Sequence, residues 1–351
     1  MTKKPALFWL IPLILLLALI PFLVPSALPT AGAEEEETVP VLEPVTLANP
    51  SPDTFLDENG EALYSPHPAG VVSDPPGYQD STISVRTEER TLKNGKGKKT
   101  KVLFTWVQIA DPAQLRTALA GRYHSQSEKR APQFAAEKKA VVAINGDWCV
   151  EPMRSGVGFV YRNGVKYREK PYHDRYGYDA LIIDNNGDFH ILRDPEVSEL
   201  EPYRDQIMHA FVFGPALVVD GVMQEIPDNK YGGGGGMGLH KTNQRQVICQ
   251  LDHLSYLIIS TEGPEQVQDG GFTGQEIARI AWEAGAQNAY NLDGGSSTWV
   301  LIAQGENAAP ARINNLKSPN QRRLTDIIYF VTAEPDPQPE PAEETAAAPE
   351  A

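Results

Sequence analysis

The sequence predicts one domain of the α/β (α+β) class, built around a strand-rich mixed sheet core with flanking helices. Short apolar runs rich in β-branched residues recur along residues 81–332 and are separated by glycine turns. Amphipathic helical stretches lie between several of these runs, which is typical of layered sheets and helices. A span of about 250 residues is the size of a single domain with a sizeable core.

Residues 1–33 have the composition of an export signal. Lys3 and Lys4 precede a long apolar stretch, and Ala31-Gly32-Ala33 provides a small-residue cleavage site before a run of glutamates. We expect cleavage there. The alternative is an uncleaved membrane anchor, because the stretch reaches the about 20 residues that span a bilayer. Both predict that the remaining chain is extracellular, either secreted or anchored at the outer face of the cell membrane.

Two low-complexity segments flank the domain. Residues 34–80 contain recurring prolines without a sustained hydrophobic period, so we expect a Pro-rich linker. Residues 333–351 consist largely of proline, glutamate and alanine. Such a segment buries too little apolar surface to offset its ordering entropy, so we expect a disordered acidic tail.

The first elements of the domain are expected to be a hairpin, two helices and a buried strand. The basic turn at residues 93–99 separates two strand-like runs; we expect its lysines to be solvated, a binding patch being the alternative. Asp111 followed by Pro112 is typical of a helix start. The expected elements are strands Thr82–Thr91 and Lys101–Ile109, helices Asp111–Leu119 and Gln133–Lys139, and strand Ala140–Ile144.

The second half of the domain is expected to be richer in strands. An amphipathic helix is expected over Thr273–Gly285, and the five glycines Gly232–Gly236 form either a lid over substrate or a floppy linker. The expected strands are Gly158–Tyr161, Ala180–Ile183, Phe189–Leu192, Phe211–Phe213, Ala216–Val219, Gln246–Leu251, Tyr256–Thr261, Ala289–Leu292, Trp299–Ile302 and Asp326–Val331.

The run Asn291–Thr298 is the strongest candidate for a site. It holds one carboxylate, two glycines and three hydroxyls within eight residues, between a strand and the next strand. Asp293 is therefore expected at a strand end on a tight glycine turn, where backbone amides can face a ligand. An ordinary Asp-Gly turn is the alternative.

Two further strand ends carry an acid beside glycine. Asn145-Gly146-Asp147 follows one expected strand, and Glu262-Gly263 follows another. With Asp293 they suggest carboxylates that converge at one sheet edge and serve acid–base chemistry, a divalent cation or both. A plain Asn-Gly turn and a surface acid are the alternatives. The histidines do not show metal-ligand spacing, so a zinc hydrolase is not supported.

The arginines and the net charge indicate which classes of ligand are expected. Arg245 precedes one expected strand, and Arg322 and Arg323 precede the last. A guanidinium suits phosphate or carboxylate, although a surface ion pair is the alternative for each. The net charge is −15, and signal cleavage would remove two lysines and no acid. This balance argues against nucleic acid as a partner and against docking on anionic lipid. Contact with a membrane is therefore expected only through the N-terminal segment, if that segment is not cleaved.

At this point the chain resembles the phosphodiester glycosidase family over about residues 100–332. The resemblance rests on five motifs in order: Ala143–Trp148, Phe213–Gly221, Arg245, Asn291–Thr298 with the preceding Gly271-Phe272-Thr273, and Arg322–Phe330. Two departures concern substrate contact. Asp147-Trp148-Cys149 stands where the family has an aromatic-rich stretch, and Arg245-Gln246-Val247 stands where it has Arg-Thr-Ala.

The resemblance implies hydrolysis of the bond between a sugar anomeric carbon and a phosphodiester, in a phosphorylated glycan or exopolysaccharide. Phosphate needs a cation or arginine, and the anomeric centre needs carboxylates near its developing positive charge. The implied catalytic residues are Asp147, Glu262 and Asp293. The implied substrate-binding residues are Asn145, Gly146, Arg245, Thr273, Gly294, Gly295, Ser296, Ser297 and Arg322.

Two rival functions stay open on sequence. One is a non-catalytic module that binds wall or capsule polysaccharide, with Trp148 and Trp299 as sugar platforms. The other is a metal-dependent phosphodiesterase that cuts the P–O bond. The two cysteines, Cys149 and Cys249, are expected either to form a disulfide in an exported protein or to remain separate free thiols.

Overall fold

The structure is a computed structural model. It describes residues 39–40, 44–123, 125, 127–147, 158–171, 178–226, 238–305, 308–315 and 322–335. The expected signal or anchor, Trp148, Cys149, the five-glycine run and most of the acidic tail lie outside the described residues. Within the ranges given above, no helix is both long and apolar enough to cross a membrane.

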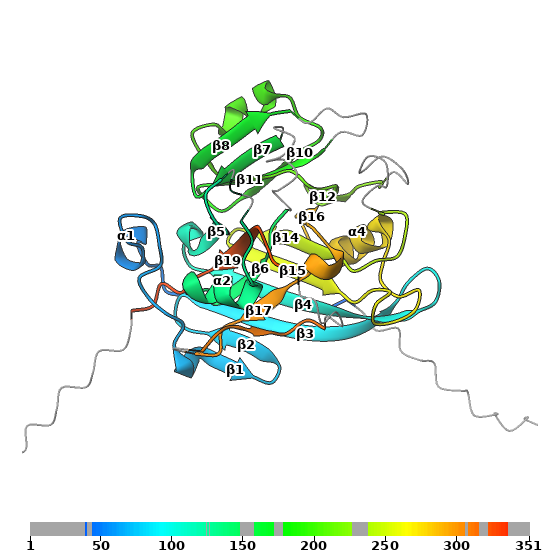
Figure 1. Cartoon of the computed structure of the whole chain (residues 1–351), viewed down its shortest axis with the longest axis horizontal. Coiled ribbons are helices and arrows are strands. Elements are labelled where there is room, and N and C mark those ends of the chain that lie inside the picture. Colours follow the sequence, from blue (N-terminus) through cyan, green and yellow to red (C-terminus); the bar gives the residue numbers. More distant parts are fainter. Residues whose placement is uncertain are drawn as a thin grey trace, which may run out of the picture. The chain divides into compact units, whose positions relative to one another are not determined.

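The described strands form three sheets (Figure 1). The first has nine strands, in the order β1 (Val71–Ser73), β2 (Pro76–Gln79), β3 (Ile83–Lys93), β4 (Lys99–Ile109), β15 (Ser255–Thr261), β14 (Gln246–Asp252), β16 (Asn288–Asn291), β12 (Ala216–Val219) and β13 (Val222–Met223).

The other two sheets have five strands each. We call them the β6 sheet and the β7 sheet. The β6 sheet has the order β18 (Ala311–Arg312), β17 (Val300–Ile302), β6 (Val142–Asn145), β19 (Asp326–Phe330) and β5 (Leu115–Leu119). The β7 sheet has the order β10 (Phe189–Leu192), β9 (Ala180–Asp184), β11 (Ile207–Phe211), β7 (Gly158–Arg162) and β8 (Val165–Lys170).

The helices are short and few among the described residues. The α-helices are α1 (Pro52–Phe55), α2 (Ala131–Glu137) and α4 (Gly274–Glu283), and the 3-10 turns are η1 (Pro68–Gly70), η2 (Pro112–Gln114), η3 (Val197–Tyr203) and η4 (Gly295–Ser297). The predicted strand-rich fold is confirmed. Neighbouring strands in the described sheets are all antiparallel, so the mixed strand directions that we expected are not found there.

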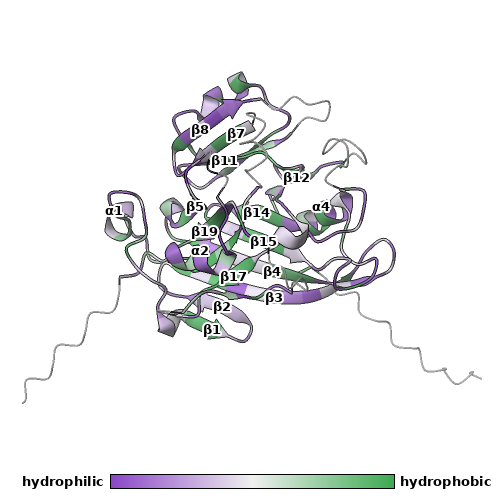
Figure 2. Ribbon diagram, in the orientation of Figure 1, coloured by the Kyte–Doolittle hydropathy of each residue, from purple (hydrophilic) through white to green (hydrophobic). Residues whose placement is uncertain are grey.

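The main core lies between the nine-stranded sheet and the two smaller sheets. Because side chains alternate along a strand, Ile248 and Ile258 join Ile144 and Ile328 in one buried cluster. Burying a side chain of this size contributes about 1.5–3 kcal/mol. Figure 2 shows apolar strands in this interior, whereas the edge strand β8 is mostly hydrophilic and partly or fully exposed.

The other face of the nine-stranded sheet is covered by α4. Val247 and Cys249 of β14 pack there with Ile277 and Ala281 of the helix. Cys249 is a free, fully buried thiol, as in the alternative of separate thiols, and its expected partner Cys149 lies outside the described residues. Because side chains alternate along the strand, Cys249 faces α4, whereas β6 packs on the opposite face of β14.

Two sequence predictions about local structure, a helix and a linker, are wrong. The expected helix Asp111–Leu119 is a 3-10 turn, η2, capped by Asp111 and followed by strand β5, because β5 pairs along its length with β19. The expected linker 34–80 is folded from residue 44 onward in the described part. Phe55 and Tyr78 are fully buried, and β2 pairs with β3.

The folded part of the chain extends past its expected C-terminal boundary, and one strand lies earlier in the sequence than expected. Ala333 is buried, and a carboxylate oxygen of Glu334 accepts a hydrogen bond from the backbone N–H of Ser81 over 2.6 Å, so the folded part continues past residue 332. The strand expected at Phe211–Phe213 is Ile207–Phe211. The strand ends there because the backbone N–H groups of Val212 and Phe213 donate to the side chains of Asp147 and Tyr290.

Candidate functional site

The loop after β6 and the first residue of β19 lie together at one edge of the β6 sheet. The two strands are antiparallel neighbours, and Asn145 pairs with Ile327. This register places Gly146 beside Asp326, whose carbonyl oxygen accepts the N–H of Gly146 over 3.3 Å. A Cβ atom on residue 146 would lie 2.1 Å from Oδ2 of Asp326, so only glycine leaves room for that carboxyl group.

The Asn145 side chain connects this edge to the loop after β16. Its Nδ2 donates to the carbonyl oxygen of Asp293 over 2.7 Å, and its Oδ1 accepts the N–H of Trp299 over 3.2 Å. Asp293 itself follows β16, which belongs to the nine-stranded sheet. The two acid-bearing turns identified in the sequence therefore meet, although they come from different sheets.

Asp293 is partly buried and faces Arg322 and Ser297. Its Oδ2 lies 3.5 Å from Nη1 of Arg322, which also donates to Oγ of Ser297 over 3.0 Å. Burial raises the pKa of the Asp293 carboxyl, while the hydrogen bond to Ser297 and the charge of Arg322 oppose the rise. The Asp293 side chain is 18% exposed and that of Arg322 is 44% exposed, so both are accessible from solvent.

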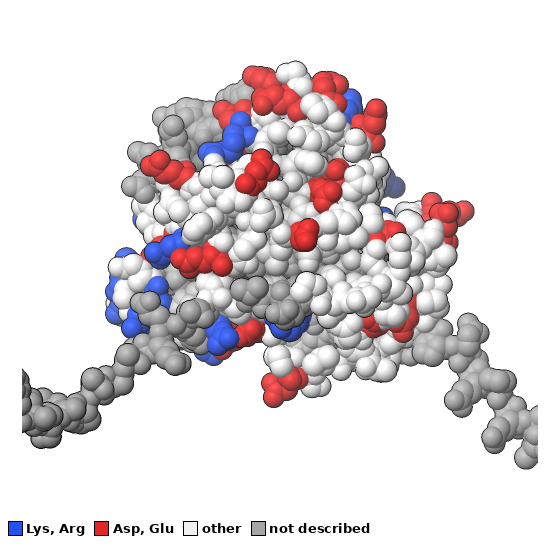
Figure 3. All heavy atoms as spheres, turned by 180° about the vertical axis from the view of Figure 1, so that it is seen from behind, with Lys and Arg blue, Asp and Glu red and all other residues white. Residues whose placement is uncertain are grey.

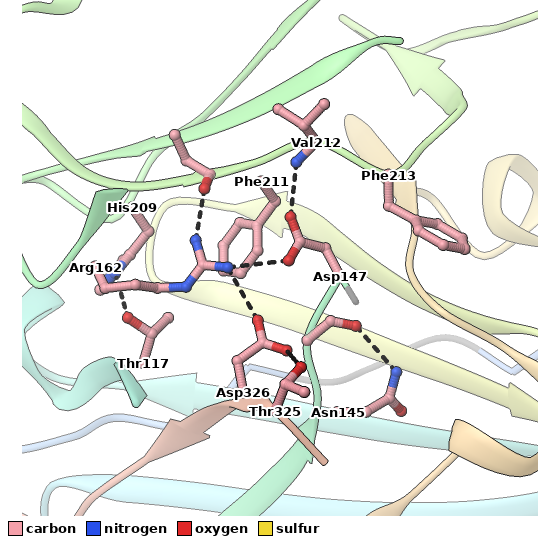
Figure 4. A network of polar contacts seen from close by, with 12 residues as sticks. Thr117, Asn145, Asp147, Arg162, His209, Phe211, Val212, Phe213, Thr325 and Asp326 are labelled. Atoms are coloured by element: carbon pink, nitrogen blue, oxygen red, sulfur yellow. Dashed lines mark hydrogen bonds and ion pairs between the residues drawn. The ribbon is translucent and has the colours of Figure 1, made fainter. Parts of the chain in front are cut away.

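Asp147 belongs to a buried polar network centred on Arg162, at the end of β7. Nη2 of Arg162 lies 3.0 Å from Oδ1 of Asp147 and 2.9 Å from Oδ2 of Asp326. The other oxygen of Asp147 accepts the N–H of Val212 over 2.7 Å. Figure 4 shows the guanidinium between the two carboxyl groups, over the ring of Phe211, with which it makes a cation–π contact.

Arg162 is also held by backbone carbonyls. Its Nη1 donates to the carbonyl oxygens of Tyr161 and Ala210 over 3.0 and 2.6 Å. The N–H of Phe213 donates to the hydroxyl of Tyr290 over 2.8 Å. These contacts fix the segment after β11 against both the β6 loop and β16, so the network links all three sheets.

A cavity of about 150 Å³ opens beside this network. Its lining includes acids and arginines, together with the residues Asn145, Ser297 and Thr325. The lining residues are Glu128, Asn145, Gly146, Asp293, Ser297, Arg322, Arg323, Leu324, Thr325 and Asp326. Such a set offers carboxyl groups and guanidinium groups to one small polar ligand.

Seven of the residues implied by the sequence do not line this cavity: Asp147, Glu262, Arg245, Thr273, Gly294, Gly295 and Ser296. Glu262 is buried, and its Oε1 accepts Nδ2 of Asn315 over 2.6 Å. Thr273 caps α4, where its hydroxyl accepts the N–H of Glu276 over 3.2 Å. Arg245 donates to the backbone carbonyls of Phe272, Gly238 and Lys241 over 2.8 to 2.9 Å, and burial lowers its pKa to about 10.

The glycine turn after Asp293 is held against β14. A Cβ atom on Gly294 would lie 2.6 Å from the carbonyl oxygen of Gln244, and Gly295 has a φ of 59°. The N–H of Gly295 donates to that same carbonyl oxygen over 3.2 Å, so this amide serves the turn. Ser296 is partly exposed beside the cavity residue Ser297.

Sequence reasoning missed four residues of the site: Glu128, Arg162, Thr325 and Asp326. Asp326 had a recognisable signal, because it is an acid at the first position of an apolar strand in the closing motif. Arg162 had none, since it ends an ordinary strand before an Asn-Gly turn. In the part of the chain that the structure describes, no cluster of three or more His, Cys, Asp or Glu side chains is placed to hold a metal ion.

The sugar platform proposed for Trp299 is not formed. This side chain is 1% exposed and packs in the core cluster between α2 and the β6 sheet. Trp148, the second expected platform, lies outside the described residues.

Comparison with known proteins shows a similar fold in a solved structure. The chain is similar to the catalytic domain of zebrafish N-acetylglucosamine-1-phosphodiester alpha-N-acetylglucosaminidase, a structure described as auto-inhibited by its pro-peptide. The TM-score is 0.55 at 13% identity, covering 86% of this chain and 99% of that one. At this identity the likeness shows the fold alone.

Among curated proteins, the chain is 23% identical over 256 residues to the SPbeta prophage-derived uncharacterized protein YomE of Bacillus subtilis (strain 168). The match covers 71% of this chain and 37% of that protein, so the chain spans little more than a third of its relative. The family model for phosphodiester glycosidase matches residues 138–331, which include Asn145, Asp147, Asp293 and Asp326. Because this match spans more than half of the chain, the protein belongs to the phosphodiester glycosidase family.

Proposed function

We propose that the protein is an exported hydrolase that cleaves the bond between a sugar anomeric carbon and a phosphodiester in a glycan or exopolysaccharide. The observation that carries the proposal is the pairing of Asp293 with Arg322 at the rim of a cavity that also contains Asp326 and Arg323. Family membership supports the reaction class. The N-terminal signal-like segment supports export or anchoring at the outer face of the membrane.

The arrangement fits the two needs of this reaction. The guanidinium groups of Arg322 and Arg323 can bind the phosphate and stabilise the charge that develops on its leaving oxygen. The carboxylate of Asp293 can stabilise positive charge at the anomeric carbon or accept a proton from water. Asn145 and Ser297 fix the positions of Asp293 and Arg322 before substrate binds.

The charge of the surface supports a polysaccharide rather than a nucleic acid as the partner. The net charge is −15, and Figure 3 shows Lys and Arg side chains interspersed with acids rather than gathered in one basic surface on that face. Nucleic-acid binding needs such a basic surface, because it depends on contacts to successive phosphates.

The test is hydrolysis of a defined glycosyl phosphodiester in isotope-labelled water. N-acetylglucosamine linked through phosphate to a methyl group is a suitable probe, because the zebrafish relative is named for an N-acetylglucosamine-1-phosphodiester. Label in the sugar hydroxyl, found by mass spectrometry, is the expected result. Label in the phosphate would replace the proposal with a P–O phosphodiesterase, and binding of polysaccharide without any hydrolysis would replace it with a binding module.

A substitution of Asp293 tests the role of the site in the same assay. Asp293→Asn removes the charge and keeps the shape, and it should lower turnover at least about a hundredfold, the scale of a lost acid–base or electrostatic group. Circular dichroism and thermal unfolding check that the variant is folded. Turnover close to the wild type in a folded variant would remove Asp293 from the mechanism.

A further inference from the structure

One nitrogen of Arg162 serves two buried carboxyl groups. Nη2 lies 3.0 Å from Asp147 and 2.9 Å from Asp326, and the three side chains are between 1% and 3% exposed. Two ionised carboxylates around one guanidinium would leave an uncompensated negative charge away from water. Carboxyl groups that share a site in this way avoid the second charge, because one of them keeps its proton.

The hydrogen bonds show which carboxyl group keeps the proton. The second oxygen of Asp147 accepts the N–H of Val212 over 2.7 Å, a fixed backbone donor that stabilises the ionised form. Among the described residues, the second oxygen of Asp326 receives a longer contact of 3.4 Å from the hydroxyl of Thr325. Burial, together with the charge of Asp147, raises the pKa of Asp326 to about 7.

The same carboxyl group is the one that reaches the cavity. Asp326 lines it, whereas the lining residues do not include Asp147. The charged groups that face Asp326 are thus Asp147 and Arg162 within the network, and Glu128, Asp293, Arg322 and Arg323 around the cavity. A neutral acid at this position can approach an anionic phosphate without repulsion and donate a hydrogen bond to it.

We propose that Asp326 is the proton donor of this site and passes its proton to the leaving phosphate oxygen of a glycosyl phosphodiester. The inference rests on the proposed function and adds a catalytic group to it. The bond between the anomeric carbon and the bridging oxygen breaks, and its electron pair goes to that oxygen, which takes the proton of Asp326. Water then supplies a hydroxyl to the anomeric carbon and a proton that restores the neutral Asp326, so atoms and charge balance.

The location of the proton is tested without substrate. Aspartate labelled at its carboxyl carbon is incorporated, and the carboxyl signals are followed by NMR as the pH is changed. The expected result is one aspartate that titrates near neutral pH in the wild type and is missing in Asp326→Asn. Asp147→Asn should lower the pH at which that signal titrates, because the repelling charge is gone and Arg162 serves Asp326 alone.

A matched control is Asp111→Asn, which removes another buried acid whose pKa is raised by burial, at the start of η2. Asparagine also caps such a turn, so the fold should persist and the signal near neutral pH should remain. A wild type without any aspartate that titrates near neutral pH, or a titration that persists in Asp326→Asn, would overturn the inference.

The donor role is tested by the leaving group. In the wild type, hydrolysis should decline as the pH rises through neutrality, because the acid form is lost. Asp326→Asn should abolish that decline and lower turnover of the methyl phosphate probe by about a hundredfold or more. The loss should be much smaller for a nitrophenyl phosphate leaving group, which departs with less need of a proton.

The outcomes separate this inference from the proposed function. An equal loss across both leaving groups, or a decline with pH that survives in Asp326→Asn, would reject Asp326 as the donor while the function stands. A folded wild type that hydrolyses neither probe would reject the proposed function and the donor role with it, whatever the NMR titration shows.

Discussion

Nδ2 of Asn145 donates a hydrogen bond of 2.7 Å to the backbone carbonyl of Asp293. Asn145 ends β6, Asp293 follows β16 of another sheet, and the two residues are 148 positions apart in the chain. The bond therefore determines how the Asn-Gly-Asp turn and the Asp-Gly-Gly turn meet. An asparagine suits the end of β6, since its amide donates to Asp293 and accepts from Trp299 at once.

Replacing Asn145 with alanine should impair both stability and catalysis. The loss of the side-chain hydrogen bonds to Gly146, Asp293 and Trp299 should lower the free energy of unfolding by about 1–3 kcal/mol. Turnover should fall at least about tenfold, because Asp293 loses its anchor. Asn314→Ala is the matched control, since that side chain bridges Thr298 and Val300 in the same way without lining the cavity. Equal turnover losses in the two variants would contradict the prediction.

Replacing Gly146 with alanine should displace Asp326. The added Cβ would lie 2.1 Å from its carboxylate oxygen, and the backbone of two paired strands limits any relaxation. A displacement of about 1 Å costs on the order of a hundredfold in rate. Gly95→Ala serves as the control, because its Cβ would lie 2.8 Å from the flexible carboxylate end of Glu276, which can shift, and residue 95 does not line the cavity. Unchanged kinetics in Gly146→Ala would show that the position of Asp326 is irrelevant.

The two arginines predicted from sequence should behave differently. Arg322→Ala should raise KM for the phosphodiester probe at least about tenfold with little change in unfolding, because this side chain is half exposed at the cavity. Arg245→Met should instead lower the free energy of unfolding by at least about 2 kcal/mol, since three buried carbonyls lose their donor. A stable Arg245→Met variant with a raised KM would restore Arg245 as the phosphate contact.

Stability should depend on pH through Asp326. Its pKa in the folded state is raised to about 7, above the unfolded value, so the folded protein binds the proton more tightly. The resulting stabilisation is complete below the unfolded pKa and is lost as the pH rises through about 7. Urea unfolding of the wild type and Asp326→Asn at about pH 5 and about pH 8 measures it. Relative to Asp326→Asn, the wild type should have a lower free energy of unfolding at the higher pH than at the lower pH. A difference between the two proteins that does not change with pH would contradict the assignment.

The sequence by itself determined the local features that depend on neighbouring residues. Thr273 and Glu276 form the capping box that starts α4, as the amphipathic pattern indicated. The buried strands β6 and β15 appear where β-branched runs stand in the sequence, within one or two residues. Asp147 and Asp293 follow strands on glycine turns as expected, because the turn chemistry is encoded in adjacent residues.

Only the tertiary structure decided which distant groups meet. The segment Leu115–Leu119 became a strand because β19 offered a full antiparallel ladder, which outweighs the helix start signal of Asp111 and Pro112. Arg245 donates hydrogen bonds to backbone carbonyls and not to the cavity. Arg162, which lies in no recognisable motif, forms ion pairs with Asp147 and Asp326. The contact of Arg162 with Asp326 joins residues 164 positions apart, and it arises from the packing of three sheets around one core. A local pattern carries no information about that packing. The sequence therefore predicted Asn145, Asp293 and Arg322 as site residues but not Arg162 or Asp326.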